Sequence, residues 1–270
     1  MNILVCIKFI VDPNQLQADE ATGKPDFQRA SYRINNWDEQ AIEAALQLAA
    51  QHGGKVVAIS LIKTPPPKEL ILTALAMGLD SVYLVKDEAG LAADAFRIAS
   101  VLAAAAGTVA ERESVDGWDV VLCGEASVDD YNGQVGPRLG TALDLPIITY
   151  ATRLDLSGNR LTADRAVEER SETVETDLPA LITVGMEIND PRRPTVLQIM
   201  GAGGKPTVEL DISELNGFDG SVFSAEASIR DIEIAAPPST RKQQVVEGDS
   251  PDEIVEELLN RLAAAGEVAF

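Results

Sequence analysis

The sequence has little of several residue types on which common chemistries depend. Its 270 residues include one histidine, His52, and two cysteines, Cys6 and Cys123. A metal centre, a Ser-His-Asp triad and a disulfide framework therefore lack the residues that each would need. Because both cysteines lie within apolar runs, we expect them to be buried free thiols of a protein in the reducing cytoplasm.

Basic residues and long apolar runs are also scarce. Lys and Arg number 22 against 43 Asp and Glu, which gives a net charge of −21. So acidic a chain is a poor partner for nucleic acid or for an anionic lipid surface. No run approaches the roughly 18 apolar residues of a membrane-spanning helix, so we expect no direct membrane insertion. The apolar start lacks a basic segment and is interrupted at Asp12-Pro13, which favours a strand over a signal peptide.

Strand and helix signals alternate along the first 150 residues. Apolar runs of strand length recur between segments in which apolar residues have helical spacing. This alternation is typical of right-handed crossovers and a mostly parallel sheet. The expected fold class is therefore α/β with a Rossmann-like sheet. Strands are expected over residues 2–7, 55–61, 81–85, 119–123 and 146–150, and helices over 37–50, 66–77, 91–106 and 133–143.

The pattern becomes antiparallel after residue 150. Two alternating segments, 152–156 and 160–166, flank Ser157-Gly158-Asn159 and predict a hairpin. Further strands are expected over residues 168–176 and 181–184, as an addition to the same sheet.

The last quarter of the chain has little periodicity until its end. Residues 201–250 are rich in glycine and proline and are interpreted as an extended arm. Ser250 and Pro251 then begin a helix whose apolar face needs a cover, supplied either by its own domain or by a partner chain. The expected domains are an α/β domain over residues 1–200 and an arm with a helix over 201–270.

The segment from Cys123 to Pro137 (CGEASVDDYNGQVGP) is the strongest candidate for a ligand site. It follows a buried strand and begins a helix. Ligands of open α/β sheets bind outside the carboxyl ends of the strands, where helix N-termini attract anions. Backbone N–H groups would hold an anion, while Asp129 or Asp130 caps the turn or bonds ribose hydroxyls. The alternative is a capped loop without a ligand.

Two other segments carry unusual side chains. Near residue 35, two asparagines offer amides, and Trp37 either presents its ring at the sheet edge or packs as a hydrophobic staple. Residues 188–206 combine three prolines, paired arginines and apolar side chains, which indicates a partner anchor or a loop packed under the arm. No segment supplies a general acid–base pair or an activated nucleophile. We therefore expect binding rather than catalysis.

Six segments spread in order over most of the chain carry a resemblance to a known family. They are LVCIKFIVD, INNWDEQAIEAAL, TALAMGLD, CGEASVDDYNGQVGP, LPALITV and INDPRRPTVLQIM. Through them the chain resembles the β subunit of electron-transfer flavoproteins. The resemblance implies an adenine-nucleotide-binding, HUP-like α/β fold and a heterodimer with an α subunit, on which residues 201–270 would pack.

The resemblance also implies cofactors. The FAD that carries electrons is shared with the α subunit and lies near Trp37. This subunit holds a structural AMP or, in electron-bifurcating members, a second FAD. Carried over by position, the nucleotide-binding residues are Cys6, Asn35, Asn36, Trp37, Asp38, Leu61, Gly124, Glu125, Ala126, Ser127, Val128, Asp129, Asp130, Asn132, Gly133, Gln134, Val135 and Gly136.

A further implication is an electron carrier rather than an enzyme. Its donors would be acyl-CoA dehydrogenases and its acceptor a membrane quinone oxidoreductase or another acceptor. Residues 188–200 are similar to the family's recognition loop, with Val196 as the anchor. The partner-docking residues are then Arg192, Arg193, Val196, Leu197, Ile199 and Met200.

The sequence departs from the family pattern at several positions. Asn36 replaces a proline, and Glu125-Ala126-Ser127 replaces a basic-glutamine-alanine triplet. Gly201-Ala202-Gly203-Gly204 stands where lysine-rich sequence is common in the family. Residues 134–137 are similar to the bifurcating branch, but Asp129-Asp130-Tyr131 is closer to the AMP-binding branch. We expect AMP, because the bulk of Tyr131 removes room for a second flavin. The alternatives are a bifurcating subunit that oxidises NADH and an adenine-nucleotide-binding regulatory protein.

Overall fold

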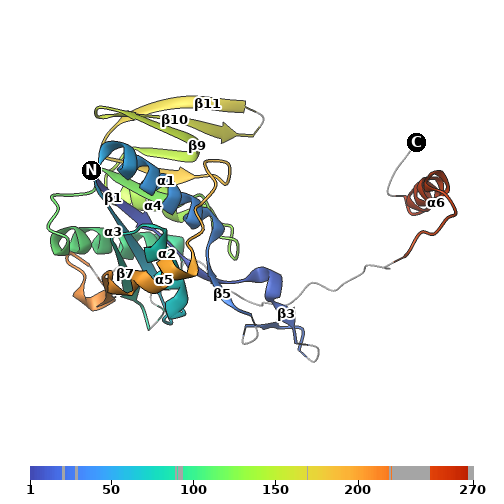
Figure 1. Cartoon of the computed structure of the whole chain (residues 1–270), viewed down its shortest axis with the longest axis horizontal. Coiled ribbons are helices and arrows are strands. Elements are labelled where there is room, and N and C mark those ends of the chain that lie inside the picture. Colours follow the sequence, from blue (N-terminus) through green and yellow to red (C-terminus); the bar gives the residue numbers. More distant parts are fainter. Residues whose placement is uncertain are drawn as a thin grey trace. The chain divides into compact units, whose positions relative to one another are not determined.

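The chain forms two units, Met1–Ile234 and Ala235–Phe270. The structure, a computed structural model shown in Figure 1, describes residues 1–19, 22–27, 30–88, 90, 94–168, 170–218, 220 and 244–266.

A nine-stranded sheet forms the centre of the first unit (Figure 1), in the order β11-β10-β9-β12-β8-β1-β6-β7-β13. Neighbouring strands from β9 to β13 in this order are parallel, while β10 and β11 are added antiparallel at one edge. The expected fold class is therefore confirmed. The strands are β1 (Asn2–Cys6), β6 (Lys55–Ile62), β7 (Ser81–Lys86), β8 (Val120–Gly124), β9 (Ile147–Ser157), β10 (Arg160–Val167), β11 (Arg170–Asp177), β12 (Ala180–Val184) and β13 (Thr207–Asp211).

Helices cover both faces of this sheet. The core under α1 (Asn36–His52) and α2 (Lys68–Met77) contains Ile3 and Val5 of β1. The core under α3 (Ala95–Arg112) and α4 (Val135–Ala142) contains Leu4 and Cys6 of the same strand. Successive side chains of a strand point to opposite faces, so a central strand covered on both sides needs a continuous apolar run.

A short extension separates β1 from α1. It contains β2 (Phe9–Val11), which pairs antiparallel with β5 (Tyr32–Ile34), and β3 (Gln17–Ala18), which pairs with β4 (Pro25–Asp26). The 3-10 turn η1 (Pro13–Gln15) starts at Asp12, whose side chain accepts from the Asn14 N–H. The sequence patterns did not predict this extension.

Three features differ from the sequence prediction. The strands expected over 146–150 and 152–156 are one strand, β9. The segment expected to be an arm from residue 201 onward contributes β13, which pairs with β7 and extends the sheet. The helix expected from residue 91 begins at Ala95. Residues 91–93 lie outside the described residues, as do residue 219 and residues 221–243 of the expected arm.

The second unit contains α6 (Pro251–Ala264). The Ser250 hydroxyl accepts from the Glu253 N–H and Pro251 stands at the first helical position, as expected. Its apolar side chains, among them Leu258 and Leu259, are exposed. Within the described part of the chain, no helix combines the length and the apolar character needed to cross a membrane.

Candidate functional site

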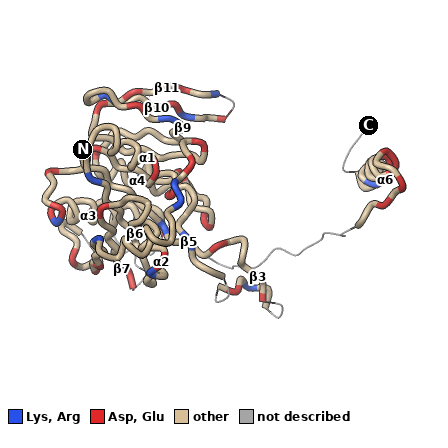
Figure 2. Tube along the Cα trace, in the orientation of Figure 1, with Lys and Arg blue, Asp and Glu red and all other residues tan. Residues whose placement is uncertain are grey.

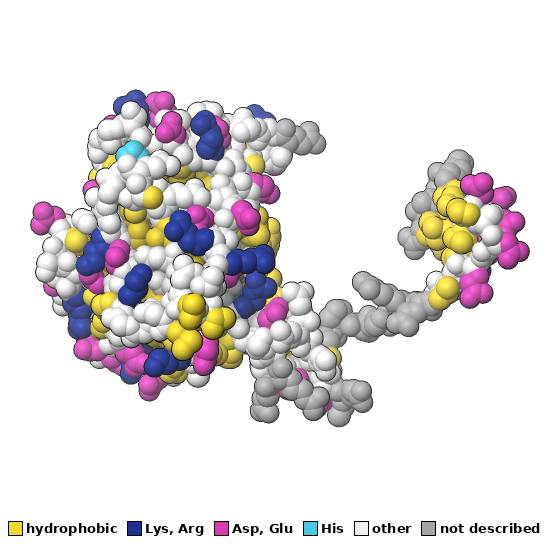
Figure 3. Space-filling view, in the orientation of Figure 1, with side chains coloured by type: hydrophobic (Ala, Val, Ile, Leu, Met, Phe, Trp, Pro, Cys, Tyr) yellow, Lys and Arg dark blue, Asp and Glu magenta, His cyan; other side chains and the backbone are white. Residues whose placement is uncertain are grey.

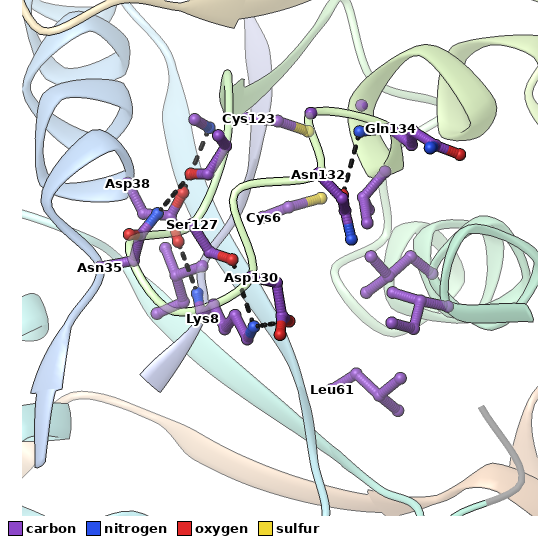
Figure 4. A pocket seen from close by; sticks show the side chains of 18 of the residues that line it. Cys6, Lys8, Asn35, Asp38, Leu61, Cys123, Ser127, Asp130, Asn132 and Gln134 are labelled. Carbon is purple, nitrogen blue, oxygen red and sulfur yellow. Dashed lines mark hydrogen bonds and ion pairs between the residues drawn. The ribbon is translucent and has the colours of Figure 1, made fainter. Parts of the chain in front are cut away.

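A cavity of about 370 Å³ lies at the carboxyl ends of β1, β6 and β8, beside the start of α4 (Figure 4). This position is the one at which open α/β sheets bind ligands. Fourteen of the eighteen predicted nucleotide-binding residues line it: Cys6, Asn35, Asp38, Leu61, Gly124, Glu125, Ala126, Ser127, Asp130, Asn132, Gly133, Gln134, Val135 and Gly136.

The loop between β8 and α4 is held by Asn35, the residue before α1. The Asn35 Nδ2 group donates to the Ala126 carbonyl oxygen at 2.8 Å, and the Val128 N–H donates to Asn35 Oδ1 at 3.1 Å. Because Asn35 is itself buried, its amide acts as a fixed template for the loop. The asparagine therefore shapes one wall of the cavity.

Asp38 joins the same loop to the end of β1. Its Oδ2 accepts from the Lys8 N–H at 2.7 Å, and its Oδ1 accepts from the Gly124 N–H at 3.2 Å. Burial raises the pKa of this carboxyl to about 7, although the bonds from Lys8, Asn35 and Gly124 lower it. The site thus contains a carboxyl that changes charge near neutral pH.

Lys8 crosses the mouth of the loop (Figure 4). Its Nζ donates to Ser127 Oγ at 3.2 Å, Asp129 Oδ1 at 2.8 Å and Asp130 Oδ2 at 2.7 Å. Burial opposes the charge of Lys8, but the two carboxylates outweigh it and raise the pKa of the ammonium. Burial also works against ionised Asp129, and the bond from Lys8 nevertheless lowers the pKa of that carboxyl. Asp129 and Asp130 are thus bound to a cation rather than free to repel an anionic ligand.

The floor of the cavity is formed by Cys6 and Cys123, which pair in register on β1 and β8. Both are free and buried, as expected from the sequence. Contact with Cys6, together with burial, raises the pKa of the Cys123 thiol. A protonated, buried thiol is a poor nucleophile, so Cys123 contributes packing to the site.

Two glycines allow elements to approach each other around the cavity. A Cβ on Gly124 would lie 2.6 Å from the Trp37 Cβ, and one on Gly136 would overlap the Thr183 side chain. Gly136 therefore brings the start of α4 against β12. The N–H groups of this helix start are the anion-binding feature that the sequence predicted.

Four predicted nucleotide-binding residues lie outside the cavity lining: Asn36, Trp37, Val128 and Asp129. The Trp37 ring packs against Tyr131, with ring centroids 5.5 Å apart. Tyr131 adopts a positive φ of 47° and is largely exposed, and it does not line the cavity. Tyr131 therefore contacts Trp37 and is not part of the cavity lining.

Sequence reasoning missed eight lining residues. Ile7 and Lys8 could have been found, because they end and follow the apolar run predicted as the first strand. The other missed residues lie at or after the ends of β6 and β7, or on α3. The missed residues are Ile7, Lys8, Ile62, Lys63, Asp87, Gly90, Ile98 and Leu102.

The predicted docking residues form a separate surface. Val196, Leu197 and Met200 lie on α5 (Val196–Gly201) and are 72%, 81% and 73% exposed, while Ile199 is half-buried. Thr195 caps this helix through its side chain and Gln198. In Figure 3, hydrophobic side chains gather over α5 beside Lys and Arg side chains, and Figure 2 shows acidic residues spread over the rest of the first unit.

The fold and the cavity together define a Rossmann-like α/β protein with a cavity of small-molecule size at the carboxyl edge of its sheet. Residues 26–215 match the electron transfer flavoprotein domain family. Electron transfer flavoprotein subunit beta of Bacillus subtilis is 36% identical over 269 residues, covering 99% of this chain and 100% of the relative. The same subunit of Thermoanaerobacterium thermosaccharolyticum is 32% identical over 263 residues, covering 97% and 98%. The chain belongs to the electron transfer flavoprotein β-subunit family, which confirms the resemblance.

Proposed function

We propose that this chain is one subunit of a cytoplasmic heterodimeric electron carrier. It takes electrons from acyl-CoA-dehydrogenase-type donors to a membrane quinone oxidoreductase or another acceptor, and shares an FAD with an α subunit. The observation that carries this proposal is the cavity that fourteen of the predicted nucleotide-binding residues line, in a chain with the family's full length. The shared FAD, when bound, supplies the redox chemistry.

The cavity fits AMP as a structural ligand. Its volume lies within the range of small-molecule sites. Leu61, Ile98 and Leu102 offer an apolar wall for a base. The start of α4, with Lys8 and Lys63 in the lining, offers N–H groups and cations for a phosphate. The residues present therefore suit a mononucleotide.

Three parts of the chain have distinct tasks in this function. The loop held by Asn35 and Asp38 binds the nucleotide and orients α4. Trp37 and Tyr131, outside the cavity, form a surface toward the shared flavin. The apolar side chains of α5 dock redox partners, because exposed apolar anchors on a stiff segment are typical of interfaces.

The test is a cofactor inventory of the co-purified α–β complex by absorbance and mass spectrometry. We expect a yellow heterodimer with one FAD and one AMP. If the heterodimer instead holds two FAD and is reduced by NADH, the AMP assignment is wrong and the chain is a bifurcating subunit. A stable, colourless chain that binds ATP without an α subunit would contradict the electron carrier and favour the regulatory protein.

A further inference from the structure

The docking helix α5 is too short to fix its own position. It has six residues, and none of them is buried. A helix of this length has little stability in water without tertiary contacts. The helix also packs against α2, and beyond it Lys205 Nζ donates to the Leu75 and Leu79 carbonyl oxygens. The orientation of the exposed Val196 and Leu197 side chains therefore depends on these contacts together with those that hold the preceding loop.

That loop is fastened to α1 by an ion pair. Arg192 Nε donates to Glu43 Oε2 at 2.7 Å, and a second guanidinium nitrogen donates to Oε1 at 3.0 Å. The Arg192 backbone N–H also donates to Oε2, at 3.2 Å. Three bonds from one residue to one carboxylate fix both the side chain and the backbone of the loop.

Neighbouring bonds strengthen this attachment. Gln47 Nε2 donates to Glu43 Oε1 at 3.1 Å, and Asn189 Nδ2 donates to the Gln40 carbonyl oxygen at 3.0 Å. The Glu43 side chain is 7% exposed and that of Arg192 is 47% exposed. The carboxylate is thus held in place on α1, and the loop is attached to it through Arg192.

Charge burial explains why this pair specifies a position. Burial disfavours ionised Glu43, yet the bonds from Arg192 lower the pKa of its carboxyl. A pair of a buried carboxylate and a half-exposed guanidinium adds little net stability compared with apolar residues, but its paired hydrogen bonds are strongly directional. Removing one partner leaves the other uncompensated.

We propose that Glu43 of α1 is a positioning residue for redox-partner recognition, which acts through Arg192 to set the orientation of the α5 docking surface. This inference rests on the proposed docking function of α5. It assigns a role to a residue that lies far from the docking loop in sequence and is buried on α1. Glu43 therefore governs docking without contributing to the interface.

The test uses the heterodimer with an acyl-CoA dehydrogenase, reduced by its substrate, as the electron donor. Glu43→Gln and Arg192→Lys each remove part of the two-bond contact between the guanidinium and the carboxylate. We expect the KM for the dehydrogenase to rise about tenfold and kcat to change less than about twofold, since docking and not chemistry is altered. The flavin spectrum and AMP content should not change, and amide exchange should accelerate over residues 189–201.

Two further variants separate positioning from folding. Glu43→Met/Arg192→Met removes both charges without leaving one buried alone, so it should fold normally and still show the raised KM. Glu172→Gln is the matched control, because it removes an exposed pair with Arg165 at the sheet edge, and its KM should equal that of the wild type.

The double variant Val196→Ala/Leu197→Ala distinguishes the two levels of the proposal, because it removes the anchor and the apolar side chain beside it. A raised KM for this variant together with a normal KM for the double methionine variant would overturn the role of Glu43. A normal KM for Val196→Ala/Leu197→Ala would overturn the docking function itself.

Discussion

Lys8, which follows β1, binds the loop between β8 and α4 through ion pairs with Asp129 and Asp130. Lys8→Met would leave Asp129 and Asp130 without their shared cation. The loop would then present uncompensated negative charge, and we expect the affinity for AMP to fall about tenfold. Because the ion pairs are partly exposed, the free energy of unfolding should change by about 1 kcal/mol or less. Isothermal titration of nucleotide-depleted heterodimer measures the affinity.

The control is Lys68→Met, at the exposed start of α2. It removes the same charge away from the cavity and should leave AMP binding unchanged. Equal dissociation constants for wild type and Lys8→Met would show that the loop keeps its binding geometry without the ammonium.

Asp38 makes folding depend on pH. In the folded protein its pKa is about 7, against 3.8 for an ordinary aspartate. The folded state therefore binds more protons between these values. The stabilising contribution of Asp38 is fully present below pH 3.8 and is lost as the pH rises through about 7.

Asp38→Asn should remove this dependence. We expect the melting temperature of the wild type to fall relative to that of the variant between about pH 5 and about pH 8. Differential scanning calorimetry measures the two profiles. Asp155→Asn, on strand β9, is the control and should run parallel to the wild type. Parallel curves for Asp38→Asn would refute the assignment of this titration to Asp38.

The contact between α4 and β12 depends on the absence of a Cβ at Gly136. In Gly136→Ala the new methyl group would overlap Thr183 Cγ2, and such overpacking costs about 1–3 kcal/mol. We expect a lower melting temperature and weaker nucleotide binding. Adding Thr183→Ser removes the overlapped methyl group and should restore much of the stability.

Gly107→Ala in α3 provides the opposite case. Among the described residues, no atom beyond the chain neighbours and the helix's own backbone lies within 4 Å of the new methyl group. Alanine also favours a helix interior over glycine by about 1 kcal/mol. This variant should therefore be more stable than the wild type. A similar loss of stability in both alanine variants would mean that overlap with Thr183 is not the cause.

The sequence predicted most elements because the central strands have continuous apolar runs, but it divided β9 and missed β13 as well as the extension between β1 and α1. Strand β9 was divided near Tyr150, where φ is +59° and the register shifts against β12. A bent strand weakens the period-2 pattern without ending the strand. Strand β13 was missed because Thr207–Asp211 is short and polar, and edge pairing depends on the backbone of β7.

The candidate site was predictable where its residues are adjacent in sequence. The segment from Gly124 to Gly136 joins a buried strand to a helix, so its position at the sheet edge follows from the pattern. Lys63 and Asp87 follow other strands, and only the strand order brings them to the same cavity. The position of Trp37 outside the lining also depended on its packing with Tyr131.

At the scale of the whole molecule, the exposed helix α6 tests whether the second unit needs a partner chain to be stable. The helix has 14 residues and exposes an apolar face, and an isolated helix of this length is marginal in water. In the chain alone we expect its amides to exchange almost as fast as in an unstructured peptide. In the complex with the α subunit they should be protected about a hundredfold.

Hydrogen exchange with mass spectrometry measures both states. Amides of β1 serve as the control, because this strand is central in the sheet and should be protected in each. Fast exchange of α6 in the complex would contradict packing of this helix on the α subunit.

The free edge at β11 has a consequence for colloidal behaviour. This strand ends the sheet, and its neighbour β10 carries Arg160, which pairs with Glu175 and Asp177 of β11. In an antiparallel pairing of two copies about the middle of this strand, Glu172 of one copy would lie opposite Glu175 of the other. The net charge of −21 adds repulsion between the two chains. Concentrated solutions should therefore resist strand-by-strand aggregation, and lowering the pH toward the isoelectric point near 4.3 should remove that protection.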